Sequence, residues 1–254
     1  LAITIALALT YVASGTNFGF TLDTVNVVYS TGQPYLSMNI DSASLYNDHE
    51  GGRLNFSDPE FIKLGQQFCS ASEGNAILRI GGSAADDLVF VSSESTENYT
   101  QNILVDSDYW DSLMDYIDTT HCKLVWDLNA LSLRNDDNSW DSTNAESLFS
   151  HMKNSGQSVY GFQFGNEPGH WYTRHYPDGP NATQLGNDLV TLRGILDSYF
   201  PDTKRRPVMF GPDNCGPGEM SDSSPCGDRK FFSDIITNGR EALSGITVHH
   251  YGEW

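Results

Sequence analysis

The fold is decided by the stretch Val159-Tyr160-Gly161-Phe162-Gln163-Phe164, followed directly by Gly165-Asn166-Glu167-Pro168. The first part is a short apolar run rich in aromatic residues, which is typical of a buried strand. The second part contains turn-forming residues and one acid. A buried strand that carries an acidic residue at its carboxyl end is typical of an enzyme built on parallel strands.

Similar apolar runs recur on both sides of this stretch and alternate with helix-like segments. We expect helices over 57–70, 109–119, 142–154, 184–199 and 229–237, the third opening with a capping box of Thr143 and Glu146. Alternation of this kind predicts β-α-β units and a parallel sheet. No Gly-x-Gly-x-x-Gly follows the first run, so a barrel is favoured over an open doubly wound sheet. The expected strands are Tyr35–Ile40, Ala76–Ile80, Lys123–Leu128, Val159–Phe164, Pro207–Phe210 and Ile246–His249.

The length of the chain limits how much of a barrel it can contain. We expect an α/β fold, a (β/α)8 TIM barrel over residues 35–254 that is truncated after about six β/α units. The strand-like segment Thr24–Tyr29, within residues 16–34, would then belong to a β-domain formed mainly by missing C-terminal sequence. Residues 1–15 are interpreted as the remnant of a secretory signal peptide.

Composition excludes some partners. With 33 acidic and 14 basic residues the formal net charge is -19, so the surface should repel nucleic acid and anionic lipid. Highly sulfated polymers should also be repelled, unless a local basic groove compensates. The opening apolar run Leu1–Val12 is too short to span a membrane, and no other segment of the sequence could do so.

Two features support the secretory route. Glycosylation sequons occur at Asn55, Asn98 and Asn181. Four cysteines can form two disulfides in three ways. We favour Cys69–Cys122, because both should lie at the amino-terminal face of the barrel, and Cys215–Cys226, which would close a loop rich in Gly, Pro and Ser.

Polar residues follow each expected strand, at the edge where a barrel enzyme has its active site. Glu167 is the candidate proton donor of a glycosidase, a role that requires a raised pKa and hence an apolar surround with a second carboxylate nearby. Asn166 suits hydrogen bonding to a sugar hydroxyl. The full set is Asp41, Ser83, Asp86, Asn129, Asn166, Glu167, Asp213, His249, His250 and Tyr251.

Other chemistry is not indicated by the sequence. His249 and His250 are adjacent on a strand, so they point to opposite faces and cannot ligate one ion. No metal site or cofactor is expected. Gly81-Gly82-Ser83 allows close approach of the backbone to a ligand but lacks the Lys of a phosphate loop.

Taken in order, several motifs resemble the heparanase family, glycoside hydrolase family 79. The resemblance spans most of the chain from about residue 22. The motifs are Leu36-Ser37-Met38-Asn39-Ile40-Asp41, Leu78-Arg79-Ile80-Gly81-Gly82-Ser83, Asp127-Leu128-Asn129-Ala130-Leu131, Gly165-Asn166-Glu167-Pro168, Gly211-Pro212-Asp213 and His249-His250-Tyr251.

The resemblance implies retaining cleavage on the glucuronic acid side of glycosaminoglycans or related glycans. Glu167 would be the acid/base, and the nucleophile a second Glu on a later strand beyond Trp254. Asp41, Asn166 and Tyr251 match positions lining the sugar site, and Ser83, Asn129 and His249 are further candidates for substrate binding. The N-terminal segment would join a β-sandwich.

The sequence also departs from heparanase. The linker excised there is absent after Phe90, which implies a single-chain enzyme, and no basic run follows Gly211-Pro212-Asp213. We therefore expect a less charged partner, a glucuronic-acid-containing polysaccharide or proteoglycan such as hyaluronan, or a plant glucuronide. Its carboxylate could be bound by Arg79, Arg134 or Arg174. The expected location is secreted, in the extracellular matrix or the lysosome.

Two alternatives remain. One is a neutral-glucan hydrolase of the same clan, which would ignore the uronic carboxylate. The other is a catalytically inactive heparanase-like protein that binds a glycan or a receptor. As a glycosidase the fragment alone should be inactive, and the open strand edges of an unclosed barrel should make it unstable whatever its function.

Overall fold

The computed structural model describes residues 37–46, 52–70, 76–93, 103–173, 179–215 and 229–250. All of them belong to one unit of the chain, residues 33–254. The expectations for residues 1–15 and 16–34 lie outside the described residues.

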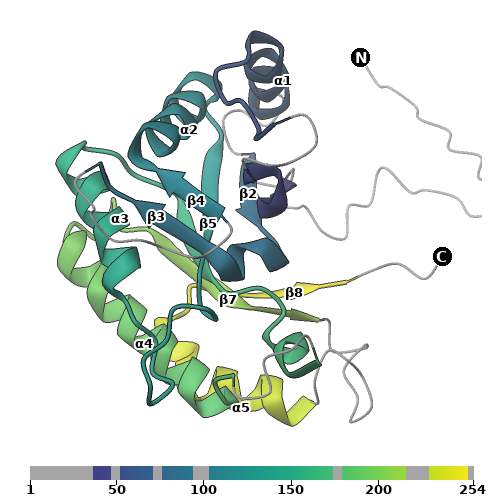
Figure 1. Ribbon diagram of the computed structural model, residues 1–254, viewed down its shortest axis with the longest axis vertical. Coiled ribbons are helices and arrows are strands. Elements are labelled where there is room, and N and C mark those ends of the chain that lie inside the picture. The colour runs from purple at the N-terminus through teal and green to yellow at the C-terminus, as the bar shows by residue number, and fades with distance from the viewer. Residues whose placement is uncertain are drawn as a thin grey trace, which may run out of the picture. The chain divides into compact units, whose positions relative to one another are not determined.

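Six strands form one parallel sheet in the order β1-β2-β5-β6-β7-β8, in which each strand adds to the same side as the chain proceeds. A doubly wound sheet would instead reverse its direction at a switch point. One-way order with right-handed crossovers sends every helix to the same face, and Figure 1 shows the helices along the outer side of the sheet. This is the arrangement of a (β/α) barrel, and the predicted fold class is confirmed. The strands are β1 (Ser37–Asp41), β2 (Ile77–Gly81), β5 (Lys123–Leu128), β6 (Gly161–Phe164), β7 (Val208–Cys215) and β8 (Gly245–His249).

The helices begin at residues that can cap them. Asp58 precedes α1 and its Oδ1 accepts hydrogen bonds from the backbone of Glu60 and Phe61. Helix α2 begins at Ser107, earlier than predicted, because the Asp106 carboxylate caps it. The helices are α1 (Pro59–Ser70), α2 (Ser107–Thr120), α3 (Thr143–Asn154), α4 (Ala182–Tyr199) and α5 (Arg229–Gly239), with short 3-10 helices η1 (Ser42–Leu45), η2 (Ser83–Asp87), η3 (Pro168–Thr173) and η4 (Arg240–Ala242).

The start of α3 differs from the predicted capping box. Ser142, not Thr143, is the residue before the helix, and its hydroxyl donates to Oε1 of Glu146 at 2.7 Å. The backbone N–H of Thr143 is instead bound by Oδ1 of Asp141 at 3.0 Å. The predicted capping box is therefore wrong, since the N-cap residue Ser142 makes no side-chain capping bond to the backbone.

The core lies between the outer face of the sheet and the helices. Trp126 of β5 packs edge-on against Trp110 of α2, with ring centroids 5.0 Å apart. Phe162 of β6 packs on Phe149 of α3 at 5.1 Å. All four rings are fully buried. Because side chains alternate along a strand, the residues between these aromatics point to the inner face, where the polar site is built.

A second, two-stranded parallel sheet was not predicted. It pairs β3 (Leu88–Val91) with β4 (Ile103–Asp106). Asn144 of α3 holds it, because its amide donates to the Phe90 carbonyl at 2.8 Å and accepts from the Phe90 N–H at 3.0 Å. Each strand is four residues long, and neither was among the expected strands.

The disulfide favoured from the sequence, Cys69–Cys122, is present, with its Cα atoms 5.4 Å apart. It joins α1 to the residue before β5, at the amino-terminal ends of the strands. Closing a loop over 53 residues removes unfolded-state entropy worth about 4 kcal/mol in the chain-entropy model. Cys226 lies outside the described residues, so the second pair stays a prediction.

Candidate active site

A cavity of about 520 Å3 opens at the carboxyl ends of the strands. This is the edge at which the sequence predicted the site. Three carboxylates and one guanidinium share the cavity with two histidines and several uncharged polar groups. Its lining is Asn39, Asp41, Arg79, Gly82, Ser83, Gln163, Asn166, Glu167, Asp213, Thr247, Val248, His249 and His250.

Glu167 follows β6 and is 4% exposed. Its Oε1 lies 2.8 Å from Nδ1 of His249 and its Oε2 lies 3.1 Å from Nδ1 of His170. Its backbone has the left-handed φ of 48°, and its N–H donates to the Asp213 carbonyl at 3.0 Å. A non-glycine residue in this region is strained, and it persists where surrounding contacts fix it, which is common at functional sites.

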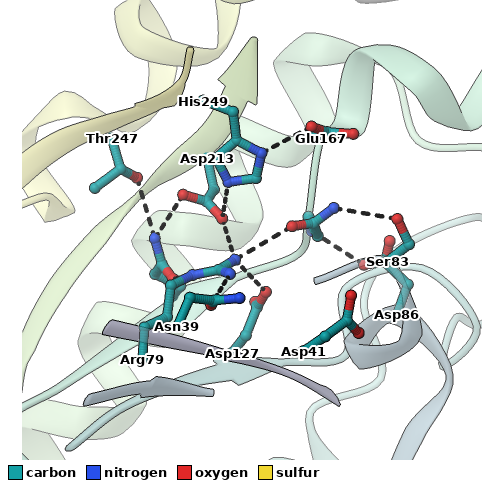
Figure 2. Close-up of polar contacts among 12 residues, drawn as sticks. Asn39, Asp41, Arg79, Ser83, Asp86, Asp127, Glu167, Asp213, Thr247 and His249 are labelled. Carbon is teal, nitrogen blue, oxygen red and sulfur yellow. Dashed lines mark hydrogen bonds and ion pairs between the residues drawn. The ribbon is translucent and has the colours of Figure 1, made fainter. Parts of the chain in front are cut away.

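The surroundings of Glu167 differ from the sequence argument. An apolar surround with a second carboxylate close by was expected, whereas the described contacts of its carboxyl group are two imidazoles. Figure 2 shows His249 between Glu167 and Asp213, in contact with both. The environment of the candidate acid is therefore polar and charged, although it is buried.

Asp213 has the second left-handed backbone of the site, with φ 55°. Its Oδ1 accepts from the Gln163 amide at 2.6 Å, and its Oδ2 contacts both Arg79 and Nε2 of His249, the latter at 3.0 Å. Burial alone would raise the pKa of Asp213, but the hydrogen bond from His249 and the charge of Arg79 outweigh burial and hold that pKa below its usual value. Asp213 is therefore a fixed negative charge.

His249 is a fixed positive charge. Its hydrogen bonds to Asp213 and Glu167 raise its pKa to about 9, against the opposing effect of burial and of Arg79. Below that pH both ring nitrogens carry protons, so His249 donates to both carboxylates. The imidazolium holds the two acids at a set separation.

This pKa shift predicts a pH dependence of stability. A folded-state pKa raised from 6.5 to about 9 stabilises the fold fully below pH 6.5, and the contribution is lost as pH rises through about 9. We expect the wild-type protein to have a higher free energy of unfolding than His249→Asn below pH 6.5. This difference, measured in urea titrations, should shrink as the pH rises from 6.5 to about 9. His121→Asn, at an exposed position on the opposite edge of the sheet, is the control. A difference that does not change between these pH values would contradict the prediction.

Arg79 of β2 organises the floor of the cavity. We name the Arg79 cluster as Arg79 and the five side chains that it contacts. The guanidinium donates to Asn39 at 2.6 Å, Asn166 at 3.2 Å and Asp127 at 3.3 Å, and also contacts Gln163 and Asp213. Gly81 makes room for it, since a Cβ there would lie 2.6 Å from Cζ of Arg79.

Two further buried carboxyl groups lie beneath the site. Burial raises the pKa of Asp127 to about 7, although the charge of Arg79 opposes the shift. Burial, followed by the charge of Asp127, raises the pKa of Asp86 well above its usual value. Asp86 accepts from the backbone of Asn166 at 3.2 Å and from the indole of Trp171 at 2.8 Å, so it fixes the loop that carries Glu167.

The candidate residues fall into distinct groups. Asp41, Ser83, Asn166 and His249 line the cavity together with Glu167. The Asn166 amide donates to the Ser83 hydroxyl at 3.4 Å and accepts from Arg79, which orients it. One oxygen of Asp41 accepts from the Ala43 N–H at 2.9 Å. Tyr251 lies outside the described residues.

Asn129 does not line the cavity. Its amide donates to the Leu88 carbonyl and the Ser132 hydroxyl, and its oxygen accepts from the backbone of Leu131 and Ser132. Both ends of the side chain therefore hold its own loop against β3. Its position after β5 was read correctly, but the direction of its side chain is set by these local bonds.

The arginines suggested for a substrate carboxylate are used within the protein. Arg79 is surrounded by its cluster. The side chain of Arg134 is 7% exposed and pairs with Asp188 of α4 at 2.8 Å. Arg174 lies outside the described residues. Of the three suggested arginines, Arg79 lines the cavity but is held by its cluster, and Arg134 is bound to Asp188 and is not part of the cavity lining.

The sequons have surface positions where they are described. Asn181 is exposed and caps α4, with its oxygen accepting from the Gln184 N–H at 2.9 Å. The oxygen of Asn55 accepts from the Ser57 N–H at 3.0 Å. Asn98 lies outside the described residues. Glycosylation stays a prediction at all three.

Several site residues were not singled out for a role in the site by sequence reasoning. Gln163 and Asp127 are polar residues within apolar strands, and this mismatch with their surroundings was the available signal. His170 and Trp171 follow Pro168 without a recognisable pattern. Among the described residues, no group of three or more His, Cys, Asp or Glu could hold a metal ion. In the same part of the chain, no helix is long and apolar enough to cross a membrane.

Comparison with known proteins relates the chain to glycosyl hydrolase family 79 and to proteins named heparanase or heparanase-like. The family model described as "Glycosyl hydrolase family 79, N-terminal domain" matches residues 73–252. Rattus norvegicus heparanase is 31% identical over 142 residues, which are 56% of this chain and 24% of that protein. Homo sapiens inactive heparanase-2 is 31% identical over 125 residues, 49% of this chain and 20% of that protein. Arabidopsis thaliana heparanase-like protein 3 is 24% identical over 192 residues, 68% of this chain and 33% of that protein. The matched part thus spans a third or less of each relative.

Proposed function

We propose a function from the premise that this chain belongs to glycosyl hydrolase family 79. The whole protein hydrolyses β-glucuronide linkages in glycosaminoglycan-like or proteoglycan glycans, with retention at the anomeric carbon. Glu167 is the acid/base. The observation that carries this proposal is the placement of Glu167, buried at the carboxyl end of β6 in a cavity of about 520 Å3.

Three contacts favour this role for Glu167. The left-handed turn directs its side chain toward His249, and the bond from its N–H to the Asp213 carbonyl ties that turn to β7. His249 and His170 bind different carboxyl oxygens, so the group is held from both sides. An acid held in this way is preorganised for proton transfer to a leaving oxygen.

Retaining hydrolysis also needs a nucleophilic carboxylate roughly 5 Å from the acid. Asp213 is less suited to that role, because Gln163, Arg79 and His249 already bind its two oxygens. We propose that Asp213 anchors His249, and that a second Glu on a later barrel strand is the nucleophile.

The choice of substrate follows from family and charge. The relatives include proteins named heparanase, but a chain of net charge -19 should disfavour highly sulfated heparan relative to hyaluronan or another less charged glucuronide. The Cys69–Cys122 disulfide fits a secreted or lysosomal protein, because disulfides persist in oxidising compartments.

Substrate screening of the full-length protein at mildly acidic pH tests this function. We expect hydrolysis of 4-nitrophenyl β-glucuronide and hyaluronan, little cleavage of heparan sulfate, and kcat/KM on 4-nitrophenyl β-glucoside lower by on the order of 100-fold or more. NMR of the first product should show the β-anomer. Equal rates on glucuronide and glucoside would favour the neutral-glucan hydrolase, and robust heparan cleavage would refute the charge argument.

The second candidate is an inactive glycan- or receptor-binding protein. It is favoured by one observation, since a protein named inactive heparanase-2 is as similar to this chain as a protein named heparanase, at 31% identity each. A folded full-length protein that binds hyaluronan but cleaves none of the four substrates would establish this candidate.

A further inference from the structure

Two cavities adjoin at the amino-terminal ends of β5, β6 and β7, on the opposite edge of the sheet from the candidate active site. Their volumes are about 630 Å3 and about 200 Å3. Ser158 and Arg205 line both cavities, so the two form one continuous depression. We name it the N-terminal groove.

The N-terminal groove concentrates positive charge in an acidic chain. The chain has only 14 Lys and Arg residues. Two carboxylates also line the groove, Asp118 and Asp202, and the basic residues outnumber them. Five basic residues line it: Lys123, Lys153, Lys204, Arg205 and Arg206.

Lys204 and Arg205 are the cations available to a ligand. Both are exposed, and neither side chain has an ion-pair partner among the described residues. Arg206 differs, because it pairs with Asp197 at 2.9 Å and donates to the Phe200 carbonyl at 3.2 Å. Arg206 therefore supports the loop, and its two neighbours face solvent at the rim of the groove.

Aromatic rings accompany the cations along the groove. The Lys123 ammonium lies 5.2 Å from the Tyr160 ring, and the Lys153 ammonium lies 5.8 Å from the Tyr199 ring. Sugar rings can pack their C–H faces on such aromatics, while acidic substituents contact Lys and Arg. A single small anion would need one cationic pocket, whereas this groove spans three strand ends.

We propose that the N-terminal groove binds a segment of anionic polysaccharide, at a site separate from the catalytic cavity. Carboxylate or sulfate groups contact Lys204 and Arg205, and sugar rings lie along Tyr199 and Tyr160. The lining of the catalytic cavity has three carboxylates against two cations, Arg79 and His249, so it is the less favourable place for a polyanion to attach first. A local basic groove lets a protein of net charge -19 hold an acidic polymer that its remaining surface repels.

The test uses the full-length protein carrying Glu167→Gln, so that cleavage does not complicate binding. The groove variant adds Lys204→Ser and Arg205→Ser. The matched control adds Lys63→Ser and Arg240→Ser, which remove the same charge from side chains that are 62% and 70% exposed. The probes are hyaluronan and heparin oligosaccharides of equal length, and inorganic sulfate, measured by calorimetry at several salt concentrations.

We expect the groove variant to bind one or both oligosaccharides about tenfold more weakly, with a shallower salt dependence. The control should bind as the parent does. Unchanged binding by the groove variant, or an equal loss in the control, would overturn the proposal. If inorganic sulfate binds as tightly as the oligosaccharides, the proposal that the groove binds an extended polysaccharide segment would be refuted.

Hydrolysis of 4-nitrophenyl β-glucuronide is measured separately, with Glu167 intact and the two groove substitutions present. Its kcat/KM should equal that of wild type, because the groove lies at the other end of the strands. If no protein hydrolyses it, the proposed catalytic function fails while the binding result still decides the groove.

Discussion

Replacing Glu167 with Gln in the full-length protein should lower kcat on hyaluronan, or any glycan with an unactivated leaving group, by about 10²–10⁴-fold. Gln has the shape of Glu and its oxygen can still accept from Nδ1 of His249, so the loop should keep its place. What is lost is the proton that the leaving oxygen requires. Binding of the glycan, measured by calorimetry, should be retained.

The nature of the leaving group sharpens this experiment. Departure of 4-nitrophenolate needs little protonation, so Glu167→Gln should slow the first step on the aryl glucuronide much less than on a glycan. Glu241→Gln, at a side chain 85% exposed on η4, is the control and should have wild-type kinetics. Glycan turnover at the wild-type rate by Glu167→Gln would remove the acid/base role.

Much of the fold could be predicted because its signals are local. The six sheet strands are apolar runs bounded by turn residues, and Asp58 and Pro59 mark the start of α1. The one-way order of strands then follows from chirality and short connections. In a barrel of parallel strands the active site lies at the carboxyl ends of the strands. Asp41, Asn166 and Glu167 follow such ends, so they could be placed together without knowledge of any contact.

The errors concern which groups contact which. Asn129 was placed at the correct edge, but its side chain turns to Leu88 and Ser132. Arg79 was considered as a partner for a substrate carboxylate, but the sequence did not indicate that strand register also brings Asp127 and Asp213 within its reach. Register and side-chain direction depend on the whole sheet, so a single strand sequence does not specify them.

Replacing Arg79 with Met should destabilise the protein by about 3–5 kcal/mol, because it removes one of the two cations that compensate the buried Asp213 carboxylate. Asp213 is 2% exposed and its carboxylate is charged. His249 and Gln163 would remain as its partners, but the ion pair with Arg79 would be lost. Urea unfolding followed by circular dichroism measures the loss. Arg240→Met, at a side chain 70% exposed, should change the free energy of unfolding little.

Activity should fall with Arg79→Met even where the protein stays folded. Arg79 orients Asn166, the neighbour of Glu167, and holds Asp213, which in turn holds His249. Loss of these contacts lets the acid move from its position, and kcat should fall more than KM rises. Arg79→Lys should not restore the rate, since an ammonium cannot make the branched set of contacts of a guanidinium.

A double substitution separates lost charge compensation from lost packing. If the loss of Arg79 as a charge partner of Asp213 is the cause, Arg79→Met with Asp213→Asn should be more stable than Arg79→Met alone, with a coupling of about 1–3 kcal/mol. If lost packing is the cause, the two effects should add. The double variant is also informative if Arg79→Met alone yields no soluble protein, because Arg79→Met with Asp213→Asn should then yield soluble protein. Additive losses would show that the Arg79 cluster acts by filling space, and the charge-based account of the site would have to be abandoned.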